Sequence, residues 1–340
     1  RRFNSRRGHS PRITNMKLRN PIVICVAITL LLITTAGTSN AARRIKSSDV
    51  IINVVGDIHG ESAIKREAIP GLKKYFADGN LNIFNLETAV TDHDKKEEKE
   101  YNFKTNLAFL KTLRSVGFNL ATVANNHSYD FGAEGFLDTL QALDKAGIKH
   151  VGGGVNSAIA YQGQIFKVKG IRIGVLGIAK VNGGPASIAG KEKPGTTNGY
   201  DATSTESAIS AIKKVSDIVI ILVHWGEEGS FCPRPAELSS ARKWQSLGAD
   251  IIVGSHTHTL QPIALEKNQL VAYSLGNFIF YSSQLENRST GLLKIRISPK
   301  KRITYSLQPF VINNLTKVPE ISDAYAAGAC LPDQAKTTVR

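Results

Sequence analysis

The chain has 340 residues, of which 42% are apolar and 21% charged, a composition typical of a globular protein and not of a disordered one. Its formal net charge is +15, but residues 1–41 hold seven Lys and Arg residues and no acid, so the rest of the chain carries +8. This modest basic excess favours an anionic partner. The sequence has no zinc-finger spacing, no RNA-binding signature and no basic helix, which argues against nucleic-acid binding.

The N-terminus has the organisation of a signal peptide. Met16, the only methionine, precedes a short basic stretch, an apolar core over residues 21–33 and a small-residue cleavage site at residues 39–41. We expect residues 1–15 to be an untranslated or upstream extension and residues 16–41 to be removed. The body is then exported to the periplasm or cell surface. The alternative is a membrane anchor over residues 21–36, although that stretch is short against the ~20 residues of a spanning helix.

Three cysteines give a second indication of export. Cys25 lies in the leader, which leaves Cys232 and Cys330 as an even pair in an oxidising compartment. We expect a disulfide between them, with two unpaired structural thiols as the alternative.

The first predicted strand, residues 50–55, leads into Gly56-Asp57-Ile58-His59-Gly60. An Asp and a His two residues apart, flanked by glycines that permit a sharp turn, resemble the opening motif of calcineurin-like metallophosphoesterases. A surface turn with the same residues is the alternative. An amphipathic helix is expected over residues 61–76.

A second strand, residues 81–86, ends before Glu87. The Glu87 carboxylate is suited to bridge two hard cations, and the alternative is a solvated acid in a loop. The charge-dense residues 91–99 favour a flexible loop over a site. After a helix over residues 106–116, a third strand, residues 118–123, leads into Asn126 and His127. Asn offers a neutral oxygen to a metal, and His suits proton transfer.

The second half continues the alternation of strands and helices. Residues 182–200, rich in Gly, Pro, Thr and Ser, predict a long surface loop. A wholly apolar strand over residues 217–223 delivers His224, and the run 249–253 precedes His256 and His258. The remaining predicted strands are 149–154, 165–168, 171–178, 270–275, 292–297 and 303–311, and the remaining predicted helices are 133–146, 204–215 and 236–247.

Five strand ends therefore present metal-binding side chains. Because the carboxyl ends of neighbouring parallel strands meet at one sheet edge, we expect these side chains to converge. His256 and His258, two residues apart, point to opposite sides of an extended loop, which suits two ions side by side. The candidate ligands are Asp57, His59, Glu87, Asn126, His224, His256 and His258.

Together the motifs resemble the poly-γ-glutamate capsule biosynthesis family, CapA, a branch of the calcineurin-like metallophosphatase superfamily. The resemblance runs from about Val50 to Val311. Two positions depart from the patterns of these groups: His59 stands where CapA-like chains often have an apolar residue, and Glu87 where the superfamily has an Asp. The motifs that carry the resemblance are Gly56-Asp57, Asn85-Leu86-Glu87, Ala124 to His127 with Asp130 and Gly132, His224-Trp225-Gly226 with Glu228, Ser255-His256 with His258, Gln261-Pro262, and Tyr273 to Phe278.

The resemblance implies a layered α/β metallophosphoesterase fold over residues 42–312, followed by a tail over residues 313–340. It also implies two divalent metals, Mn, Fe or Zn, with Glu87, or less favourably Asn85, between them. His127 would protonate a leaving group or stabilise charge, and Asp130 would either orient His127 or cap a helix. One metal would be held by Asp57, His59 and His258, and the other by Asn126, His224 and His256.

Three functions stay open at this stage. The first is hydrolysis of poly-γ-glutamate or a related anionic polymer, and the second is hydrolysis of a small phosphoester. The third is a capsule assembly or export factor that binds polymer through the metal site without turnover, in contact with capsule synthesis or export machinery. Fold analogy alone does not choose among them.

Overall fold

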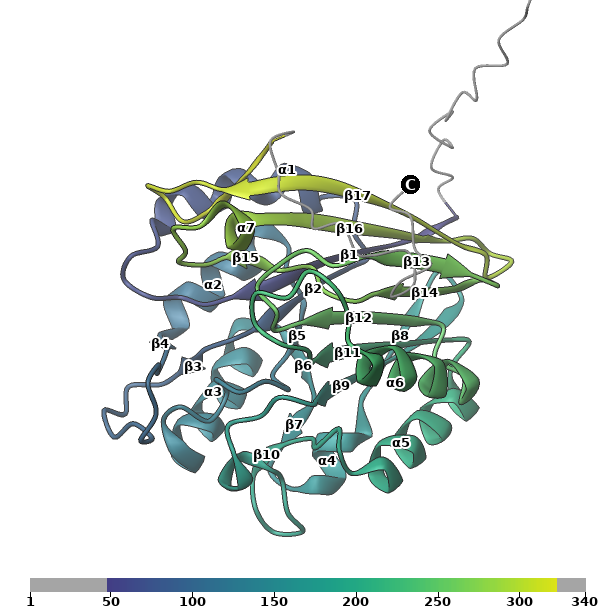
Figure 1. Cartoon of the computed structure of the whole chain (residues 1–340), viewed down its shortest axis with the longest axis horizontal. Helices are drawn as coiled ribbons and strands as arrows, with labels where there is room; N and C mark the ends of the chain where they lie inside the picture. Colours follow the sequence, from purple (N-terminus) through teal and green to yellow (C-terminus); the bar gives the residue numbers. More distant parts are fainter. Residues whose placement is uncertain (1–47, 323–340) are drawn as a thin grey trace, which may run out of the picture. The chain divides into compact units, whose positions relative to one another are not determined.

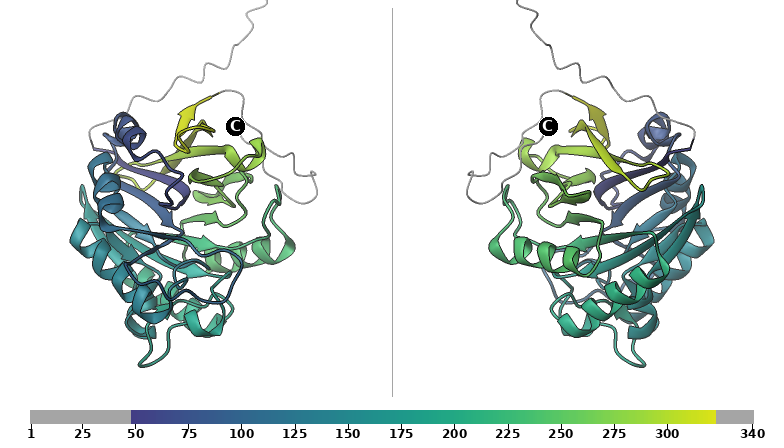
Figure 2. Two further views of the ribbon diagram at one scale, coloured as in Figure 1. Left: turned by 90° about the vertical axis from the view of Figure 1, so that its left-hand side faces the viewer. Right: turned by 90° about the vertical axis from the view of Figure 1, so that its right-hand side faces the viewer.

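Two β-sheets lie face to face and carry helices on their outer faces (Figure 1, Figure 2). The computed structural model describes residues 48–322, which belong to one compact unit. Within these residues one sheet has eight strands and the other six. The layered α/β fold predicted from the sequence is confirmed.

The first sheet combines strands from both ends of the described chain. Its strand order is β18 (Pro319–Ile321), β17 (Ile303–Ile312), β16 (Ser289–Ile297), β1 (Val50–Ile58), β2 (Leu81–Leu86), β5 (Leu120–Thr122) and β6 (Lys149–Val151), with β15 (Asn277–Ile279) paired to β1.

The second sheet is built from the middle of the chain. Its order is β13 (Ile263–Glu266), β14 (Gln269–Ala272), β12 (Ile251–Ser255), β11 (Ile218–His224), β9 (Ile171–Ala179) and β8 (Gln164–Val168). Two small pairs join β3 (Ala89–Val90) to β4 (Lys104–Thr105) and β7 (Gly153–Gly154) to β10 (Gly195–Thr196).

Helices complete the outer layers. The first sheet is covered by η1 (Arg66–Leu72), α1 (Lys73–Phe76), α2 (Leu107–Val116) and α3 (Gly132–Ala146). The second is covered by α5 (Ala202–Val215) and α6 (Pro235–Ser246). The shorter helices are α4 (Ser157–Gln162), η2 (Pro185–Ser187) and α7 (Leu285–Arg288).

The alternation of side chains along each strand explains the long apolar runs in the sequence. Successive residues of a strand point to opposite faces, and in this sandwich both faces of the central strands are buried. In β11, Ile218, Ile220 and Leu222 enter the core between the sheets. The other three, Val219, Ile221 and Val223, pack against the helical layer.

Several element predictions were wrong in extent. The helix expected over residues 61–76 is a 3-10 helix followed by the four-residue α1, and Pro70, which has no backbone N–H, lies inside the 3-10 segment. Residues 182–200 include η2 and β10, so they are not wholly irregular. The short strands β13, β15 and β18 were not predicted, and β18 extends the first sheet beyond residue 312.

Parallel pairing brings the strand ends of interest to one side. In the first sheet β2 lies parallel to both β1 and β5. In the second, β11 lies parallel to β9 and β12. Gly56 permits the close approach of β1 to the segment before β15, because a Cβ at this position would lie 1.8 Å from the carbonyl oxygen of Gly276.

Three predictions lie outside the described residues: the status of residues 1–15, the signal peptide over residues 16–41, and most of the C-terminal tail. Among residues 48–322, no helix combines the length and apolar character needed to cross a bilayer.

Candidate metal centre

Asp57, near the end of β1, is fully buried at the side where the strand ends meet. Its Oδ1 accepts a hydrogen bond from Asn85 Nδ2 at 2.8 Å, and its Oδ2 accepts one from the backbone N–H of His256 at 3.2 Å. Burial raises the pKa of this carboxyl group, while His258 and the two hydrogen bonds oppose the increase. Asp57 is therefore rigidly placed, but its charge lacks full compensation.

Glu87 follows β2 and is also fully buried. No donor among the described residues forms a hydrogen bond to either carboxylate oxygen. Glu87 forms an ion-pair contact with His224, whose Nε2 lies 3.4 Å from Glu87 Oε1. Burial, and next the neighbouring Asp57 carboxylate, raise the pKa of Glu87 well above its ordinary value.

His224 ends β11 and points into the space between the two sheets. Its Nδ1 lies 2.9 Å from Ser255 Oγ, and its Nε2 lies 2.8 Å from Asn126 Oδ1. Burial lowers the pKa of His224 well below its usual range, so the ring is held neutral. A neutral imidazole fixed at one nitrogen is the form that binds a metal through the other.

His256 and His258 follow β12 with unusual backbone conformations. Their φ angles are 93° and 57°, positive values that non-glycine residues adopt in only a few per cent of cases, although His adopts them more often than most. The strain in such residues is typical of functional sites. Here it turns both side chains toward the strand ends: the His256 ring lies 4.7 Å from the His224 ring, and His258 Nδ1 lies 3.6 Å from Asp57 Oδ2.

Each of these two histidines has a distinct environment. His256 Nδ1 is buried and has no hydrogen-bond partner among the described residues. Burial, followed by the neighbouring His258, lowers the pKa of His256 to about 3. His258 Nδ1 lies 2.7 Å from the side-chain oxygen of Asn277, which holds the ring in place.

Two groups of ligand atoms result, and they share Glu87. One atom from each of Glu87, His224 and His256 lies within 4.8 Å of the other two, and the same holds for Asp57, Glu87 and His258. A buried carboxylate without a donor, beside a second carboxylate and an unpaired ring nitrogen, is costly unless a cation compensates it. These residues therefore fit divalent metal ions, and the mixture of oxygen and nitrogen ligands suits Mn, Fe or Zn.

The structure brings most of the predicted ligands together. Asp57, Glu87, His224, His256 and His258 form the two groups, and Asn126 adjoins them through His224. The side-chain oxygen of Asn85, the less favoured bridging candidate, instead accepts a hydrogen bond from Asn125.

His59 is the predicted ligand that the structure leaves outside both groups. Its Nε2 accepts a hydrogen bond from the backbone N–H of Tyr281 at 3.0 Å. Its ring packs against Phe103, with centroids 5.0 Å apart, and against Phe280 at 4.1 Å. Burial lowers the pKa of His59 to about 3, so the ring is neutral, and its Nδ1 is buried without a hydrogen-bond partner among the described residues.

His127 and Asp130 form a separate pair next to the ligands. His127 Nδ1 lies 2.9 Å from Asp130 Oδ2, which also accepts the backbone N–H of Phe103 at 2.7 Å. Burial lowers the pKa of His127, and the Asp130 carboxylate opposes that effect. The N-cap of α3 is Phe131, without a side-chain cap, so the geometry favours Asp130 as the group that orients His127.

Sequence reasoning missed the contribution of Lys99 and Phe103. Residues 91–99 were expected to be a flexible loop away from the site, yet Lys99 Nζ pairs with Asp130 and donates to the backbone oxygen of Asn126 at 2.9 Å. The Phe103 ring lies 4.3 Å from the His127 ring. Nothing in the sequence separates Lys99 from Lys95 and Lys96 in the same charged run.

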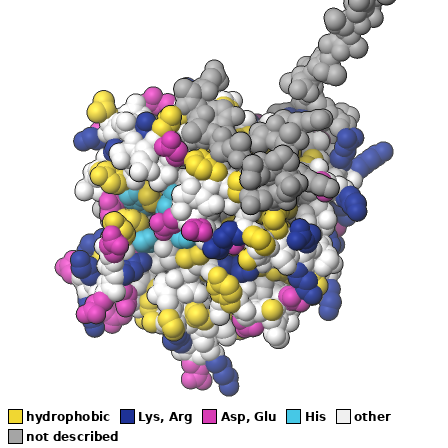
Figure 3. Space-filling model, viewed as in Figure 1, with side chains coloured by type: hydrophobic (Ala, Val, Ile, Leu, Met, Phe, Trp, Pro, Cys, Tyr) yellow, Lys and Arg dark blue, Asp and Glu magenta, His cyan; other side chains and the backbone are white. Residues whose placement is uncertain are grey.

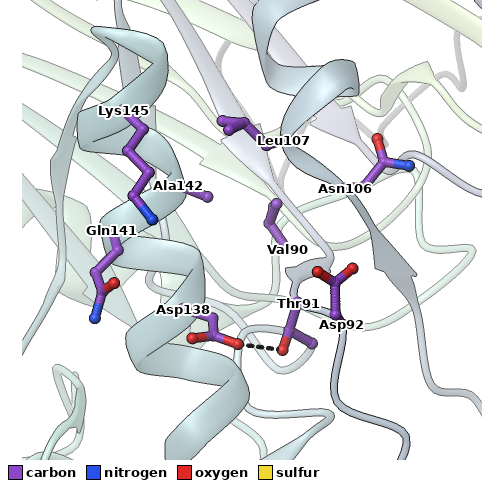
Figure 4. A pocket seen from close by; sticks show the side chains of 9 residues that line it. All are labelled: Val90, Thr91, Asp92, Asn106, Leu107, Asp138, Gln141, Ala142 and Lys145. Carbon is purple, nitrogen blue, oxygen red and sulfur yellow. Dashed lines mark hydrogen bonds between the residues drawn. The ribbon is translucent and has the colours of Figure 1, made fainter.

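The start of this loop is fixed at a separate pocket of 210 Å³ between β3, α2 and α3 (Figure 4). There Thr91 Oγ1 donates to Asp138 Oδ2 at 2.6 Å. None of the predicted site residues lines this pocket. The Thr91–Asp138 hydrogen bond fixes the start of the segment that contains Lys99.

The disulfide prediction is tested only at one end. Cys232, in the loop before α6, takes part in a disulfide. Cys330 lies outside the described residues, so the Cys232–Cys330 pairing stays a prediction.

Two facing sheets thus bring buried His, Asp and Glu side chains together at their strand ends. Over residues 49–282 the chain matches the model described as "Bacterial capsule synthesis protein PGA_cap", and it therefore belongs to that family. The CapA resemblance seen in the motifs is confirmed.

Relatives with assigned names agree. The PGA biosynthesis protein CapA of Bacillus subtilis is 31% identical, over 82% of this chain and 76% of its own. The capsule biosynthesis protein CapA of Bacillus anthracis is 29% identical, over 84% and 75%. Similar solved structures include TT1561 of Thermus thermophilus, with a TM-score of 0.45 and 13% identity over 76% of this chain and 98% of that one. Another is the 5'-nucleotidase of Candida albicans, with a TM-score of 0.44 and 13% identity over 81% and 54%.

Proposed function

We propose that this protein is an exported, metal-dependent hydrolase that acts on poly-γ-glutamate or a related anionic polymer. The observation that carries the proposal is the sharing of the buried Glu87 by two groups of ligand atoms. A carboxylate between two sets of ligands is the arrangement needed by a pair of divalent ions. The polymer is suggested by the names of the CapA relatives, which refer to capsule and PGA biosynthesis.

The ligand assignment follows the two groups. Asp57 and His258 would hold one ion, and His224 and His256 the other, with Glu87 shared between the two groups. Asn126 completes the second set, since its Oδ1 lies beside the metal-facing nitrogen of His224. When bound, such a pair of ions lowers the pKa of a water molecule and polarises the bond under attack.

His127 is assigned to proton transfer. Asp130 fixes the ring at Nδ1, which leaves Nε2 to face a leaving group. Donation from Nε2 requires the imidazolium form, and the Asp130 carboxylate stabilises that form against the burial that disfavours it. Lys99 holds Asp130 and the backbone of Asn126, so it positions both the proton-transfer pair and a ligand.

The test is metal content and hydrolysis rate measured on the same preparations. We expect about two equivalents of transition metal in the wild-type protein, together with release of shorter chains from poly-γ-glutamate. His256→Ala should lose metal and activity, whereas His93→Ala, an exposed histidine that pairs with Asp138, serves as the matched control.

Two results would redirect the proposal. Turnover of small phosphoesters but not of poly-γ-glutamate would make the protein a phosphoesterase. Well-metallated protein that hydrolyses neither would contradict catalysis and favour an assembly or export factor that binds polymer at the metal site. Export itself is checked by mass spectrometry of the cell-derived protein, which should begin near Ala42; an intact N-terminus on cytosolic protein would contradict it.

A further inference from the structure

Three β-hairpin turns form a basic surface far from the metal ligands in the fold. They comprise residues 167–170, 266–269 and 299–302, between β8 and β9, β13 and β14, and β16 and β17, and are called the basic end below. Figure 3 shows Lys and Arg side chains gathered along the right-hand edge, where these last two hairpins turn, while histidine side chains lie in the left half. The basic end has one acidic side chain, Glu266, and six basic ones: Lys167, Lys169, Lys267, Lys300, Lys301 and Arg302.

Hydrogen bonds hold the turns together as one surface. Asn268 Nδ2 donates to the backbone oxygen of Lys301 at 3.0 Å, and its Oδ1 accepts the backbone N–H of Ile303 at 2.8 Å. Lys169 Nζ donates to the backbone oxygen of Asp49 at 2.6 Å, which ties the turn at residues 167–170 to the start of β1. The positions of the cations are therefore set by the fold.

Most of this charge is not neutralised by the protein. Lys301 pairs with Asp217 at 2.9 Å. Four basic side chains remain after Lys169, which binds a backbone oxygen, and Lys301 are set aside. All four are exposed, and none forms an ion pair with any residue in the 48–322 range: Lys167, Lys267, Lys300 and Arg302. A charged surface of this kind is often merely solvated, so its location in the fold is the second observation that matters.

The basic end contains a hollow of 460 Å³. Three consecutive cations, residues 300–302, line it together with Asn268. Apolar side chains of Leu265 and Ile303 form part of the same lining. Cations around a partly apolar hollow suit a phosphate group that carries apolar chains.

The basic end is also where the chain enters the sheet. β1 begins at Val50, paired with Ile297 of β16, and runs away from this end to Asp57 at the metal centre. In the sequence, only 16 residues separate Val50 from the apolar stretch that ends at Ile33. Even fully extended, they span at most about 55 Å. A leader inserted in a bilayer, whether retained or awaiting cleavage, therefore keeps the point where the chain enters the sheet within that distance of the bilayer.

We propose that the basic end docks on an anionic lipid surface, with the candidate metal centre facing away from the bilayer. Charge complementarity and the entry point of the chain both favour lipid over capsule polymer. A polymer track would need its cations beside the metal ligands, whereas these lie at the opposite ends of the strands. Each basic residue close to an anionic membrane strengthens binding about fivefold at moderate salt.

The test compares the full chain with Lys300→Glu/Arg302→Glu by vesicle co-sedimentation. The control is Lys95→Glu/Lys96→Glu, the same change in charge at two exposed lysines of the loop by the metal centre. Vesicles are pure phosphatidylcholine, or phosphatidylcholine with about one-third phosphatidylglycerol. The quantity compared among the three proteins is the ratio of binding to the two kinds of vesicle. The basic leader itself favours anionic vesicles, but it is identical in all three proteins, so a difference in the ratio reports the substituted residues. Circular dichroism verifies that each variant is folded.

We expect the wild-type ratio to exceed one and to fall with added salt. Lys300→Glu/Arg302→Glu should reduce the preference at least ~25-fold, and the control should retain it. Equal loss in both double variants would overturn the proposal, since net charge would then explain the binding. A wild-type ratio of one would overturn it too. So would displacement of the protein from anionic vesicles by soluble polyglutamate together with tighter binding to that polymer.

Discussion

The ligand cluster around Glu87 and the group around His127 are neighbours, but they satisfy their buried polar atoms in opposite ways. Both Glu87 oxygens and His256 Nδ1 lack hydrogen-bond partners among the described residues. In the other group, the His127 ring and the Asp130 carboxylate contact each other, and Lys99 contacts both. Glu87 and His256 in the first region and His127 and Asp130 in the second are all buried.

This difference separates a region suited to bind metal from a region whose geometry is fixed by the protein alone. Side chains with unmatched charge need an external cation, so the first region is complete only when metal is bound. Side chains that satisfy one another keep their geometry without a ligand, so the second region is preorganised. Substitutions should therefore change metal content in the first region and turnover alone in the second, and four predictions test this contrast.

The largest effect is expected for Glu87→Gln, because Glu87 belongs to both groups of ligand atoms. Loss of an outer partner of a ligand costs 10- to 100-fold in metal affinity, so loss of a shared ligand should exceed about 100-fold at both sites. Metal titration followed by elemental analysis measures this. Glu192→Gln, an exposed acid in the loop between η2 and β10, should keep its metal. Loss of a single ion in Glu87→Gln would show that Glu87 is not shared.

His127→Ala should lower turnover ~10²- to 10⁴-fold, the usual contribution of a positioned acid or base. Its metal content should stay at the wild-type level, since Nδ1 is committed to Asp130. Steady-state kinetics and metal analysis on one preparation decide the matter. A metal-depleted His127→Ala protein would place this histidine in the first region.

Lys99→Met should reduce turnover ~10- to 100-fold, the range for partners that orient a functional group. The loss should fall on kcat more than on KM, and Lys99→Arg should restore part of it because the guanidinium can still pair with Asp130. Lys96→Met, in the same charged run, is the control. Equal kinetics for Lys99→Met and wild type would remove the loop from the catalytic apparatus.

The smallest effect concerns stability without metal. Because burial and Asp57 raise the pKa of Glu87 in the folded state, its ionised form destabilises the apo protein. Metal-free Glu87→Gln should therefore be more stable than wild type by ~1–3 kcal/mol above that raised pKa. The gain should shrink as the pH falls through it and vanish below about 4.5, where the carboxyl group is protonated in both states. Urea denaturation of both proteins across pH provides the measurement, and excess metal should reverse the order. A pH-independent difference would rule out the titration of Glu87 as its cause.

The sequence predicted the strand-borne part of the centre well. Asp57, Glu87 and His224 each end or follow a short apolar strand, and such strands are recognisable because both of their faces are buried in the sandwich. Parallel pairing aligns the strand ends within each sheet, as expected. The sequence argument assumed a single sheet edge, however, and it is the face-to-face packing of two sheets that brings His224 to Asp57 and Glu87.

Loop conformation accounts for what the sequence did not predict. The orientation of His256 depends on a φ of 93°, for which a His-x-His pattern gives no signal. His59, a ligand according to the resemblance, lies outside the two groups of ligand atoms, and its ring packs against Phe103 and Phe280. Its Nδ1 is buried without a hydrogen-bond partner among the described residues, so its role as a ligand stays a prediction. Lys99 was dismissed because a charged run is usually solvated, and only the return of the chain through β4 brings it to Asp130.

The shared centre also has a mechanical meaning. Asp57 and Glu87 lie in β1 and directly after β2 of the first sheet, whereas His224 and His256 lie in β11 and directly after β12 of the second sheet. Ions held by both sets would link the two sheets of the sandwich at one edge. At a free metal concentration 1,000 times the dissociation constant, such a fastening adds about 4 kcal/mol to the free energy of unfolding. Metal depletion should therefore speed amide hydrogen exchange in β2 and β11, so that the edge between the sheets begins to open before the rest of the fold.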